Sequence, residues 1–405
     1  MPGYGRRYWA ERTTRRRNYP AFKGEHTADV VVIGGGLTGC MTASVLASGG
    51  LDVVLVEAGR LASGATAGGL GVVLSTPGES YHAIEAAVGR RNARVIWKET
   101  ERSSRELTTA LGKLPIGCDV TSAPGVLNAV TPADALALRR EQKARKAGGQ
   151  AASWVTAAAT SAELGTESAG AIHFGHAATF DPVRAALGFA QAATRKRARV
   201  FERSRVKRTR FTRTTATVVL ERGTVETRGI VVATGEPGPV APQLRRHVRT
   251  STGYVVVTEP LTAAMRREAG ARRAVTVEPG ADPHLLRWLP DHRAVFAGAL
   301  SKPVAARLRD KALVQRTAQL MYEFSVRYPV ISGLPARWGW DVPVVSTLDG
   351  LPWIGPHRNY PFHFFAVALG WSGDAMAWWA ARAALRFFTS KARREDAVFG
   401  FTRRA

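Results

Sequence analysis

The 405-residue chain has only two cysteines, Cys40 and Cys118, and no apolar run long enough to cross a bilayer. Two thiols are too few for a disulfide-stapled secreted domain or a zinc site of several thiolates, and they fit a reducing compartment. A disordered or fibrous chain is also excluded, because 45% of the residues are hydrophobic and 22% are charged. The sequence therefore predicts a soluble globular protein with a sizeable core and at least two domains.

Acidic residues are scarce. The chain has 32 Asp and Glu against 57 Lys and Arg, which gives a formal net charge of +25. Such a charge is typical of proteins that bind a polyanion, such as nucleic acid or an anionic membrane surface. GC-rich coding, which favours Arg and Ala, is the alternative. The basic residues are scattered through predicted helices and strands, and this scatter favours the compositional explanation over a nucleic-acid partner.

The arginine-rich start of the chain does not continue as a targeting signal. A secretory or twin-arginine signal needs an apolar stretch after the arginines. Here the residues after Arg17 are polar and turn-forming, as in Asn18-Tyr19-Pro20. We therefore expect a cytoplasmic protein without a membrane span.

The segment from residue 28 to 57 has the pattern of a dinucleotide-binding unit. Residues 28–33 are a short β-branched run typical of a buried parallel strand, and residues 40–47 form a helix of small residues. Between them lies Gly34-Gly35-Gly36-Leu37-Thr38-Gly39, and a second strand over 52–56 ends at Glu57.

Each part of this pattern has a physical role in dinucleotide binding. Gly34 permits the tight turn, Gly36 lets the backbone approach a pyrophosphate, and Gly39 lets the helix pack on the strand. The helix N-terminus attracts the phosphates. Glu57 lies about twenty residues further on, where a carboxylate takes the ribose hydroxyls.

The loop after Glu57 favours FAD over a nicotinamide cofactor. A nicotinamide-binding domain would return to a helix, whereas this loop of small residues can run under a long extended cofactor. A flexible surface linker is the alternative, although linkers usually carry more charge and proline. The candidate cofactor contacts in the loop are Ala58, Arg60, Ser63, Gly64, Ala65, Thr66, Gly68 and Gly69.

Taken together, the motifs resemble the D-amino-acid-oxidase-like superfamily of FAD-dependent oxidoreductases, which includes glycine oxidase, sarcosine oxidase and γ-glutamylputrescine oxidase. The resemblance covers nearly the whole chain. It rests on an aromatic N-terminal arm (8–9 and 19–22), the glycine-rich turn, the loop 62–66, the Ala-Thr-Gly end of segment 230–235, and segments 347–356 and 368–375.

The resemblance implies an α/β fold, with a Rossmann-type FAD-binding domain and an interleaved α+β substrate domain built on an antiparallel sheet. We expect residues 1–100, 176–250 and 336–405 to form the FAD-binding domain, and residues 101–175 and 251–335 the substrate-binding domain. Further cofactor contacts that it implies are Val206, Thr234, Gly235, Gly350, Gly370, Trp371, Ser372, Gly373, Asp374 and Ala375.

Local patterns in the remaining segments agree with this organisation. Residues 215–227 read as a hairpin around Glu221-Arg222-Gly223. Long helical patterns cover 81–111 and 305–328, and strand-like runs cover 253–258 and 293–298. A helix beginning after Gly373 would direct its positive dipole toward whatever lies before it.

The activity implied by the resemblance is oxidation of a carbon–nitrogen bond in a small amine or amino acid. A hydride passes to flavin N5, the resulting imine hydrolyses, and oxygen or another acceptor reoxidises the flavin. Because the chain has no cysteine after Cys118, the cysteinyl link of monomeric sarcosine oxidases cannot form, and we expect FAD to be bound without a covalent bond.

Substrate placement is assigned to two residues. Arg287 is the candidate cation for a substrate carboxylate, with an arginine paired at a domain surface as the alternative. Tyr254 either lines the flavin face or packs within the sheet. The chain departs from its relatives at Leu285, Ala299 and Asp374, which puts the usual amino-acid substrates in doubt.

No metal site is expected, because His173 and His176 are close in sequence but lack further ligands. Two other functions remain open. One is an RNA-associated flavin-dependent enzyme that acts on a modified base and uses the positive field of the protein. The other is a flavin-binding protein without turnover.

Overall fold

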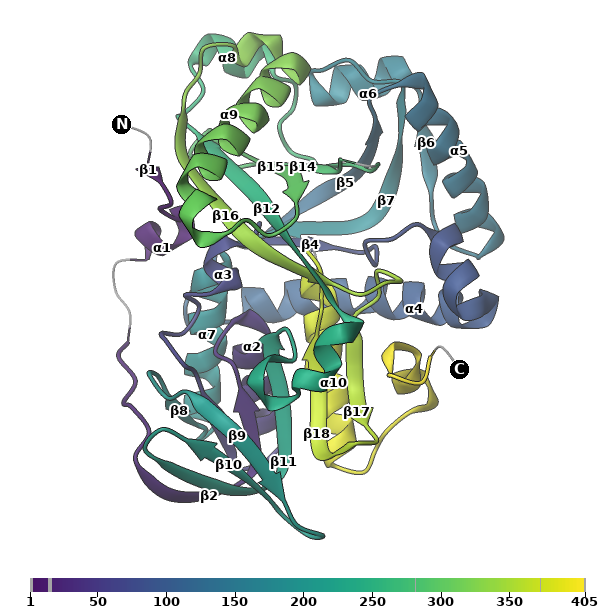
Figure 1. The fold of residues 1–405 in the computed structure, drawn as a ribbon. Coiled ribbons are helices and arrows are strands. Elements are labelled where there is room, and N and C mark those ends of the chain that lie inside the picture. The colour runs from purple at the N-terminus through teal and green to yellow at the C-terminus, as the bar shows by residue number, and fades with distance from the viewer. Residues whose placement is uncertain (1–2, 14–16, 281, 372, 404–405) are drawn as a thin grey trace.

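In the computed structural model, which describes residues 3–13, 17–280, 282–371 and 373–403, the strands form two sheets (Figure 1). The smaller sheet occupies the lower half of Figure 1, and the larger sheet, with α8 and α9, the upper half. The long helix α4 runs between the two halves. This arrangement confirms the predicted α/β fold class.

The smaller sheet contains the Rossmann-type unit, with the strand order β17-β18-β11-β2-β3-β8. Strands β8, β3, β2, β11 and β18 are parallel, and β17 is antiparallel at the edge. The run from Val30 to Ile33 is fully buried, as expected for a strand covered on both faces. The strands are β2 (Gly24–Ile33), β3 (Val53–Val56), β8 (Arg199–Phe201), β9 (Val206–Phe211), β10 (Ala216–Leu220), β11 (Gly223–Gly235), β17 (Trp353–His357) and β18 (Tyr360–Val367).

Different elements cover the two faces of this sheet. On one face, α2 (Leu37–Ser48) packs between α7 (Pro182–Arg195) and α10 (Asp374–Phe388) and contacts Val30 and Val32 through a common core. On the other face, Val31 and Ile33 share a core with strands β9 and β10. The predicted hairpin is confirmed, since Leu220 of β10 pairs with Gly223 of β11.

The larger sheet has the order β1-β16-β12-β15-β14-β13-β5-β7-β4, with β6 paired to β7. Its pairs are antiparallel except β1 with β16 and β13 with β5. The strands are β1 (Gly3–Tyr4), β4 (Val72–Leu74), β5 (Thr121–Ala129), β6 (Ser153–Val155), β7 (Gly170–Thr179), β12 (Arg249–Thr258), β13 (Val275–Glu278), β14 (His284–Trp288), β15 (Ala294–Ser301) and β16 (Ala336–Ser346).

Helices cover both sides of the larger sheet. Helix α9 (Arg309–Arg327) packs on β12, β15 and β16, and α4 (Tyr81–Gly112) packs on β4 and β7. Helix α4 has a break at Gly89, where φ is 78°. The other helices are α1 (Tyr8–Arg12), α3 (Ala65–Gly68), α5 (Pro132–Ala147), α6 (Ala157–Leu164), α8 (Ala263–Glu268), and the 3₁₀ turns Gly238–Val240, Pro242–His247, Ala306–Leu308, Pro329–Ile331 and Arg394–Phe399.

Sheet membership differs from the proposed domain boundaries at three strands. Strands β1, β4 and β16 lie in ranges that we assigned to the FAD-binding domain, yet they pair within the larger sheet. The difference arises because the sheet of a strand is set by its distant partners, which local sequence does not reveal. The chain consequently passes back and forth between the two sheets.

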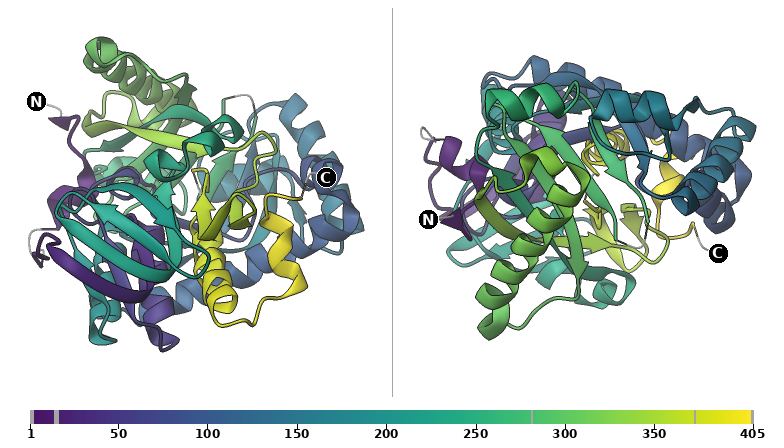
Figure 2. Two further views of the ribbon diagram at one scale, coloured as in Figure 1. Left: turned by 60° about the horizontal axis from the view of Figure 1, so that its bottom comes forward. Right: turned by 90° about the horizontal axis from the view of Figure 1, so that it is seen from above.

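The views in Figure 2 show β1 and the last described residues on opposite sides of the molecule, as in Figure 1. Among the described residues, we find no helix with the length and apolar character needed to cross a membrane.

Candidate cofactor and substrate site

The turn between β2 and α2 is shaped by its glycines. Gly34 has φ 109°, in the region that favours glycine, and a Cβ there would lie 2.5 Å from the Ala233 oxygen. A Cβ on Gly39 would collide with the Gly34 carbonyl. Gly36 differs, because a Cβ there would approach only the Thr66 hydroxyl, at 3.2 Å. Gly34 and Gly39 therefore close the turn against its neighbours, and Gly36 leaves open space above it.

Helix α2 begins without a side-chain cap on this open side. Its N-cap residue is Gly36, and the Leu37 N–H donates to Thr66 Oγ1 at 2.8 Å. The first N–H groups of a helix lack intrahelical acceptors and carry partial positive charge. Their position over the open turn suits a bound anion such as a phosphate.

The carboxylate of Glu57 is held beside the same turn. Its Oε2 accepts from the Gly35 N–H at 2.6 Å, and its Oε1 accepts from the Gly59 N–H at 2.7 Å. These two backbone donors fix the side chain at the carboxyl end of β3. A carboxylate so placed has the geometry to accept hydrogen bonds from the hydroxyls of a ribose.

Two adjoining cavities follow the carboxyl ends of the parallel strands. The first, of about 390 Å³, lies over the glycine-rich turn, and we call it the fingerprint cleft. The second, of about 500 Å³, reaches the start of α10, and we call it the central cleft. The two clefts have several lining residues in common, including Leu37 and Thr234. Together they therefore form one groove past the N-terminus of α2.

Most of the sequence-predicted cofactor residues lie along this groove. The fingerprint cleft is lined by Gly34, Gly36, Leu37, Thr38, Glu57, Ala58, Arg60, Ser63, Gly64, Ala65, Thr66, Val206, Thr234 and Gly235. The central cleft is lined by Leu37, Thr38, Ala65, Thr66, Gly69, Thr234, Gly235, Gly370, Trp371, Gly373 and Asp374.

Other predicted cofactor residues lie off the groove walls. Gly39 packs within the turn, Ala375 is buried, and Gly68 accepts a hydrogen bond from Trp340 Nε1 at 3.1 Å. Gly350, with φ 70°, lies against Glu79. Ser372 lies outside the described residues.

The far end of the groove is formed by the segment between β18 and α10. Trp371 packs against Gly253, where a Cβ would lie 2.8 Å from the indole ring. The indole Nε1 is buried and has no acceptor within the described part of the chain. Burial also raises the pKa of the Asp374 carboxyl to about 7. Both residues line the central cleft, and within the described part of the chain neither polar group has a partner.

The charge of the central cleft is opposite to that of the whole chain. Among the described residues that line it, the ionisable ones are Glu236 and Asp374, and none is Lys or Arg. Glu236 is already paired with Arg245, whose Nη2 lies 3.1 Å from its Oε1. Asp374 is therefore the stronger candidate for holding a cationic ligand.

Arg287 lies behind the wall of the central cleft instead of on it. The residue is 3% exposed, and its Nη1 donates to the carbonyl oxygens of Leu70, Gly71 and Phe180 at 2.5–2.9 Å. Burial lowers the pKa of its guanidinium to about 9. These contacts give Arg287 a role in supporting the wall, while its proposed contact with substrate stays a prediction.

Tyr254 lies on the α9 side of β12, away from the groove. It belongs to the core formed with Leu286, Phe296 and Phe324, whereas the neighbouring Gly253 contacts Trp371. Of the two interpretations of Tyr254, these contacts favour packing within the sheet. Side chains alternate between the two faces of a strand, so Tyr254 and its neighbour Gly253 lie on opposite faces of the sheet.

The histidines noted in the sequence have ordinary partners. His173 Nε2 lies 2.9 Å from Glu163 Oε2, and His176 Nε2 lies 2.8 Å from the Thr108 hydroxyl.

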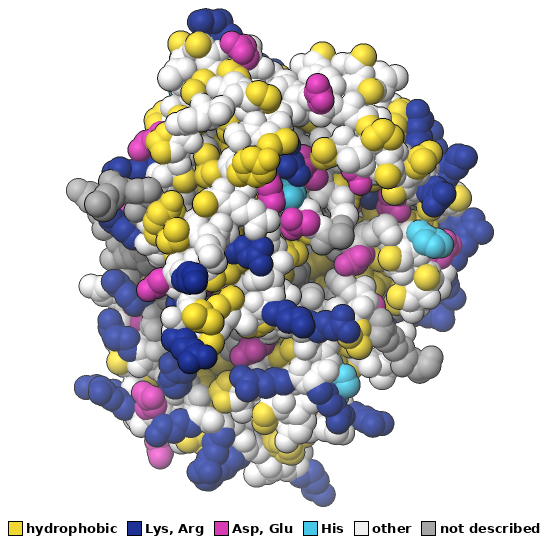
Figure 3. All heavy atoms as spheres, turned by 45° about the horizontal axis from the view of Figure 1, so that its top comes forward, with side chains coloured by type: hydrophobic (Ala, Val, Ile, Leu, Met, Phe, Trp, Pro, Cys, Tyr) yellow, Lys and Arg dark blue, Asp and Glu magenta, His cyan; other side chains and the backbone are white. Residues whose placement is uncertain are grey.

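Lys and Arg side chains are spread over the face in Figure 3, with more of them over its lower half. Acidic side chains gather near the hollow in the middle of that face.

Sequence reasoning missed one whole wall of the central cleft. The end of β16 contributes Val342, Pro343, Val344 and Val345, and Pro182 and Thr250 lie nearby on the lining. No motif marks these residues. The only sequence signal for them would have been the length of the apolar run in β16.

Comparisons with known proteins agree with this geometry. A family model described as FAD dependent oxidoreductase matches residues 29–386. The gamma-glutamylputrescine oxidoreductase of Escherichia coli K12 is 25% identical over 353 residues, which are 86% of this chain and 81% of that protein.

Two solved structures have the same fold at low sequence identity. Glycine oxidase from Geobacillus kaustophilus has a TM-score of 0.78 at 18% identity, covering 94% of this chain and 100% of that one. L-alpha-glycerophosphate oxidase from Mycoplasma pneumoniae, solved with FAD bound, has a TM-score of 0.72 at 16% identity, covering 90% and 95%.

Proposed function

This chain belongs to the DAO family of FAD-dependent oxidoreductases, and we propose that it oxidises the C–N bond of a cationic amine held in the central cleft. The observation that carries the proposal is the continuous groove from the glycine-rich turn to the start of α10. One end of this groove suits the dinucleotide, and the other end, lined partly by residues predicted to contact the flavin, would hold the flavin ring beside the amine.

The residues along the groove fit FAD. Open space over Gly36 and the uncapped start of α2 suit the pyrophosphate, and the fixed carboxylate of Glu57 suits the ribose. When bound, FAD would supply a hydride acceptor: once the ammonium has given a proton to a base such as water, the neutral amine would lose a hydride, and the resulting iminium would hydrolyse. Oxygen or another acceptor then takes the electrons.

We propose that the cofactor is bound without a covalent link to cysteine. Cys40 and Cys118 are both buried, and burial raises the pKa of each thiol above its usual value. Neither residue lines the groove. Both thiols therefore lack the exposure and the thiolate character that a covalent bond to the flavin requires.

The lining of the central cleft supports an amine over an amino acid as substrate. A carboxylate needs a cation for recognition, and the described lining offers none. An ammonium group can instead pair with ionised Asp374 and lie against the Trp371 ring, as cations do on aromatic faces. The apolar side chains of Val342 and Val344 would exclude water from the rest of the ligand.

Anaerobic mixing with matched pairs of compounds tests this function. Each pair is an amino acid and the amine formed by removing its carboxyl group, and the flavin absorbance reports reduction. We expect the amine of a pair to reduce the flavin with at least tenfold higher kcat/KM. Asp374→Asn should lower this preference, and Glu236→Gln should change it less, because Glu236 is already paired with Arg245.

Two results would contradict the proposal in different ways. A flavin that dithionite bleaches, but that no amine or amino acid reduces, would favour a binding protein without turnover. A consistent preference for the amino acid of each pair would retain the oxidoreductase but exclude the amine assignment.

A further inference from the structure

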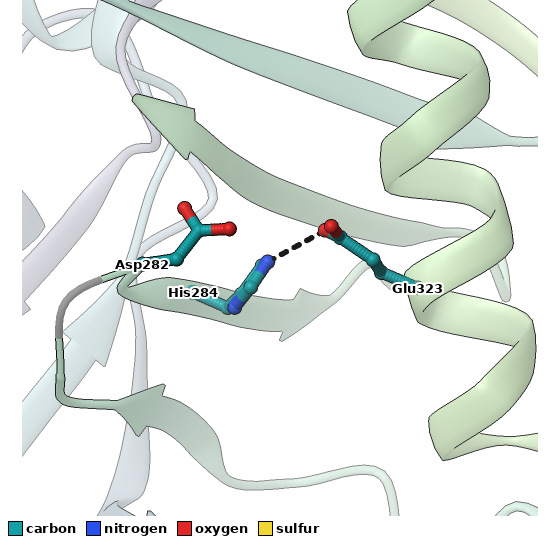
Figure 4. Close-up of side chains that lie close together, drawn as sticks. All are labelled: Asp282, His284 and Glu323. Atoms are coloured by element: carbon teal, nitrogen blue, oxygen red, sulfur yellow. Dashed lines mark hydrogen bonds and ion pairs between the residues drawn. The ribbon is translucent and has the colours of Figure 1, made fainter. Parts of the chain in front are cut away.

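Three potential metal ligands meet on the far side of the larger sheet from the groove. Asp282 lies in the loop before β14, separated by Pro283 from His284, the first residue of that strand, and Glu323 lies on α9. One ligand atom of each lies within 4.8 Å of the others. Figure 4 shows the Asp282 and Glu323 carboxylates directed toward the same space beside the His284 ring.

The imidazole of His284 is fixed in this position. Its ring stacks on Phe296 at 5.0 Å and 6°, and Phe296 stacks on Phe324 at 5.0 Å and 17°. Gly298 leaves room for the ring, because a Cβ there would collide with it. His284 Nε2 lies 2.8 Å from Glu323 Oε2. The ring is thus held with Nε2 toward the acidic side chains.

Outer partners hold the remaining atoms of these side chains. Glu278 Oε2 lies 3.6 Å from His284 Nδ1 and 2.5 Å from Arg327 Nε. Gln319 Nε2 donates to Glu323 Oε1 at 2.8 Å, and Glu323 Oε2 contacts His284 Nε2, so a metal ion would replace the proton between these two atoms. A donor behind a carboxylate is a usual outer partner of a metal ligand, and behind the histidine Arg327 Nη2 lies 3.3 Å from Nδ1.

Within the described part of the chain, acidic side chains outnumber basic ones around His284. The facing carboxylates are Asp282, Glu278 and Glu323, and the permanent cation among them is Arg327. A proton on His284 adds one positive charge at most and leaves an excess of negative charge. A divalent ion with a neutral imidazole would cancel it. Among the described residues, Asp282 makes no ion pair or hydrogen bond, although a second carboxylate lies within 4.8 Å.

We propose that Asp282, His284 and Glu323 bind one divalent transition-metal ion of the Zn²⁺ class. The ligands are His284 Nε2, Glu323 Oε2 and one oxygen of the exposed Asp282 side chain, and water fills the remaining position. The ion ties the loop before β14 to α9. Because His284 and the groove lie on opposite faces of the sheet, this role is structural and independent of the proposed oxidation.

Zinc titration of chelator-treated holoenzyme tests the site. We expect calorimetry to show one saturable equivalent of Zn²⁺ and thermal unfolding to show a zinc-dependent rise in Tm. Asp282→Asn should weaken binding at least tenfold while the protein stays folded, since Asp282 is exposed. Glu323→Gln should do the same.

His173→Ala is the matched control, because His173 also contacts a glutamate at 2.9 Å but belongs to no three-ligand cluster among the described residues. It should bind Zn²⁺ like the wild type. Absence of a saturable equivalent in the wild type would overturn the proposal. Equal binding by the wild type and Asp282→Asn would also overturn it, because the ion would then be held elsewhere.

Discussion

Among single residues, the glycines at the start of α2 have separable roles. A Cβ on Gly36 meets only a hydroxyl at 3.2 Å, whereas a Cβ on Gly39 collides with the backbone of Gly34. One position therefore borders the groove and the other closes the turn. Their substitutions should affect different properties of the protein.

We predict that Gly36→Ala lowers FAD affinity at least tenfold with little loss of stability. Gly39→Ala should instead destabilise the fold by roughly 1–3 kcal/mol or more, because overpacking against backbone cannot relax. Flavin retention on gel filtration and urea unfolding of the apoprotein measure the two effects. Gly112→Ala at the end of α4, where a Cβ would make an ordinary contact with Val120 at 3.9 Å, is the control. Equal loss of stability in both variants would contradict this distinction.

Asp374 makes stability depend on pH. Burial raises its pKa to about 7 in the folded protein, so the folded state keeps a proton that the unfolded state loses near pH 4. The apoprotein should therefore lose stability as the pH rises from about 4 to 7. One pKa unit corresponds to about 1.4 kcal/mol, and partial exposure to solvent reduces the total to roughly 1–2 kcal/mol.

Asp374→Asn should flatten this part of the pH profile, because asparagine does not titrate. Urea unfolding of the apoprotein at several pH values measures the effect. The exposed Asp310→Asn on α9 serves as the comparison. Parallel profiles for the wild type and Asp374→Asn would show that the carboxyl is not desolvated.

Among the helices and strands, α5 contains a buried ion pair between Glu141 and Arg145 that also contacts α4. The Tyr81 N–H at the start of α4 donates to both oxygens of Glu141, at 2.8 and 3.0 Å. Glu141 Oε1 also accepts from Arg145 Nε at 2.6 Å, and Arg145 lies over the Trp97 ring. Both side chains of the pair are more than nine-tenths buried.

We predict that Glu141→Leu costs about 3–5 kcal/mol of unfolding free energy, because it leaves a buried charge on Arg145. The double variant Glu141→Leu with Arg145→Met should recover part of this loss. It should retain a cost of roughly 1–3 kcal/mol for the unpaired Tyr81 N–H. Chemical unfolding of the wild type and the two variants measures these costs. A double variant less stable than the single one would contradict this account.

Features that adjacent residues determine could be predicted from the sequence, and features that depend on distant partners could not. The strand–turn–helix unit, the hairpin at Leu220 and Gly223, and helices α4 and α9 could be predicted, because adjacent residues determine them. Membership of β16 in the larger sheet could not, because its partners are β1 and β12, distant in the chain.

The residues of the candidate site also fall into two groups, those that local sequence indicates and those that depend on distant segments. The fingerprint-cleft residues between 34 and 66 lie in one contiguous stretch, so the local pattern indicated them, whereas Val206, Thr234 and Gly235 came from the family resemblance. Arg287 was assigned from its strand, but its contacts with Leu70 and Phe180 depend on how distant segments pack. The approach of Glu323 to His284 joins a helix to a strand in the same manner. The spacing of residues in the sequence contains no signal for such contacts between distant segments.

At the scale of the molecular surface, Lys and Arg are spread over the face drawn in Figure 3, and the central cleft is acidic. Figure 3 shows Lys and Arg across the visible face, without a single dense stripe. Dispersed charge attracts polyanions weakly and without sequence preference. This distribution favours the compositional explanation of the net charge of +25.

We predict that RNA retained at low salt dissociates by about 150 mM salt, and that removing it leaves flavin reduction unchanged. Filter binding across a salt series and anaerobic kinetics after ribonuclease treatment measure these outcomes. A complex that persists at that salt with one RNA sequence, and not with others, would support the RNA-associated enzyme instead.

The repeated passage of the chain between its two sheets has a practical consequence for protein engineering. Neither sheet is encoded by a contiguous piece of the gene, so a truncation made to isolate one of them removes strands from both. Exchange of substrate preference between homologues must therefore transplant side chains lining the central cleft, since cutting and joining whole segments would leave unmatched strand edges.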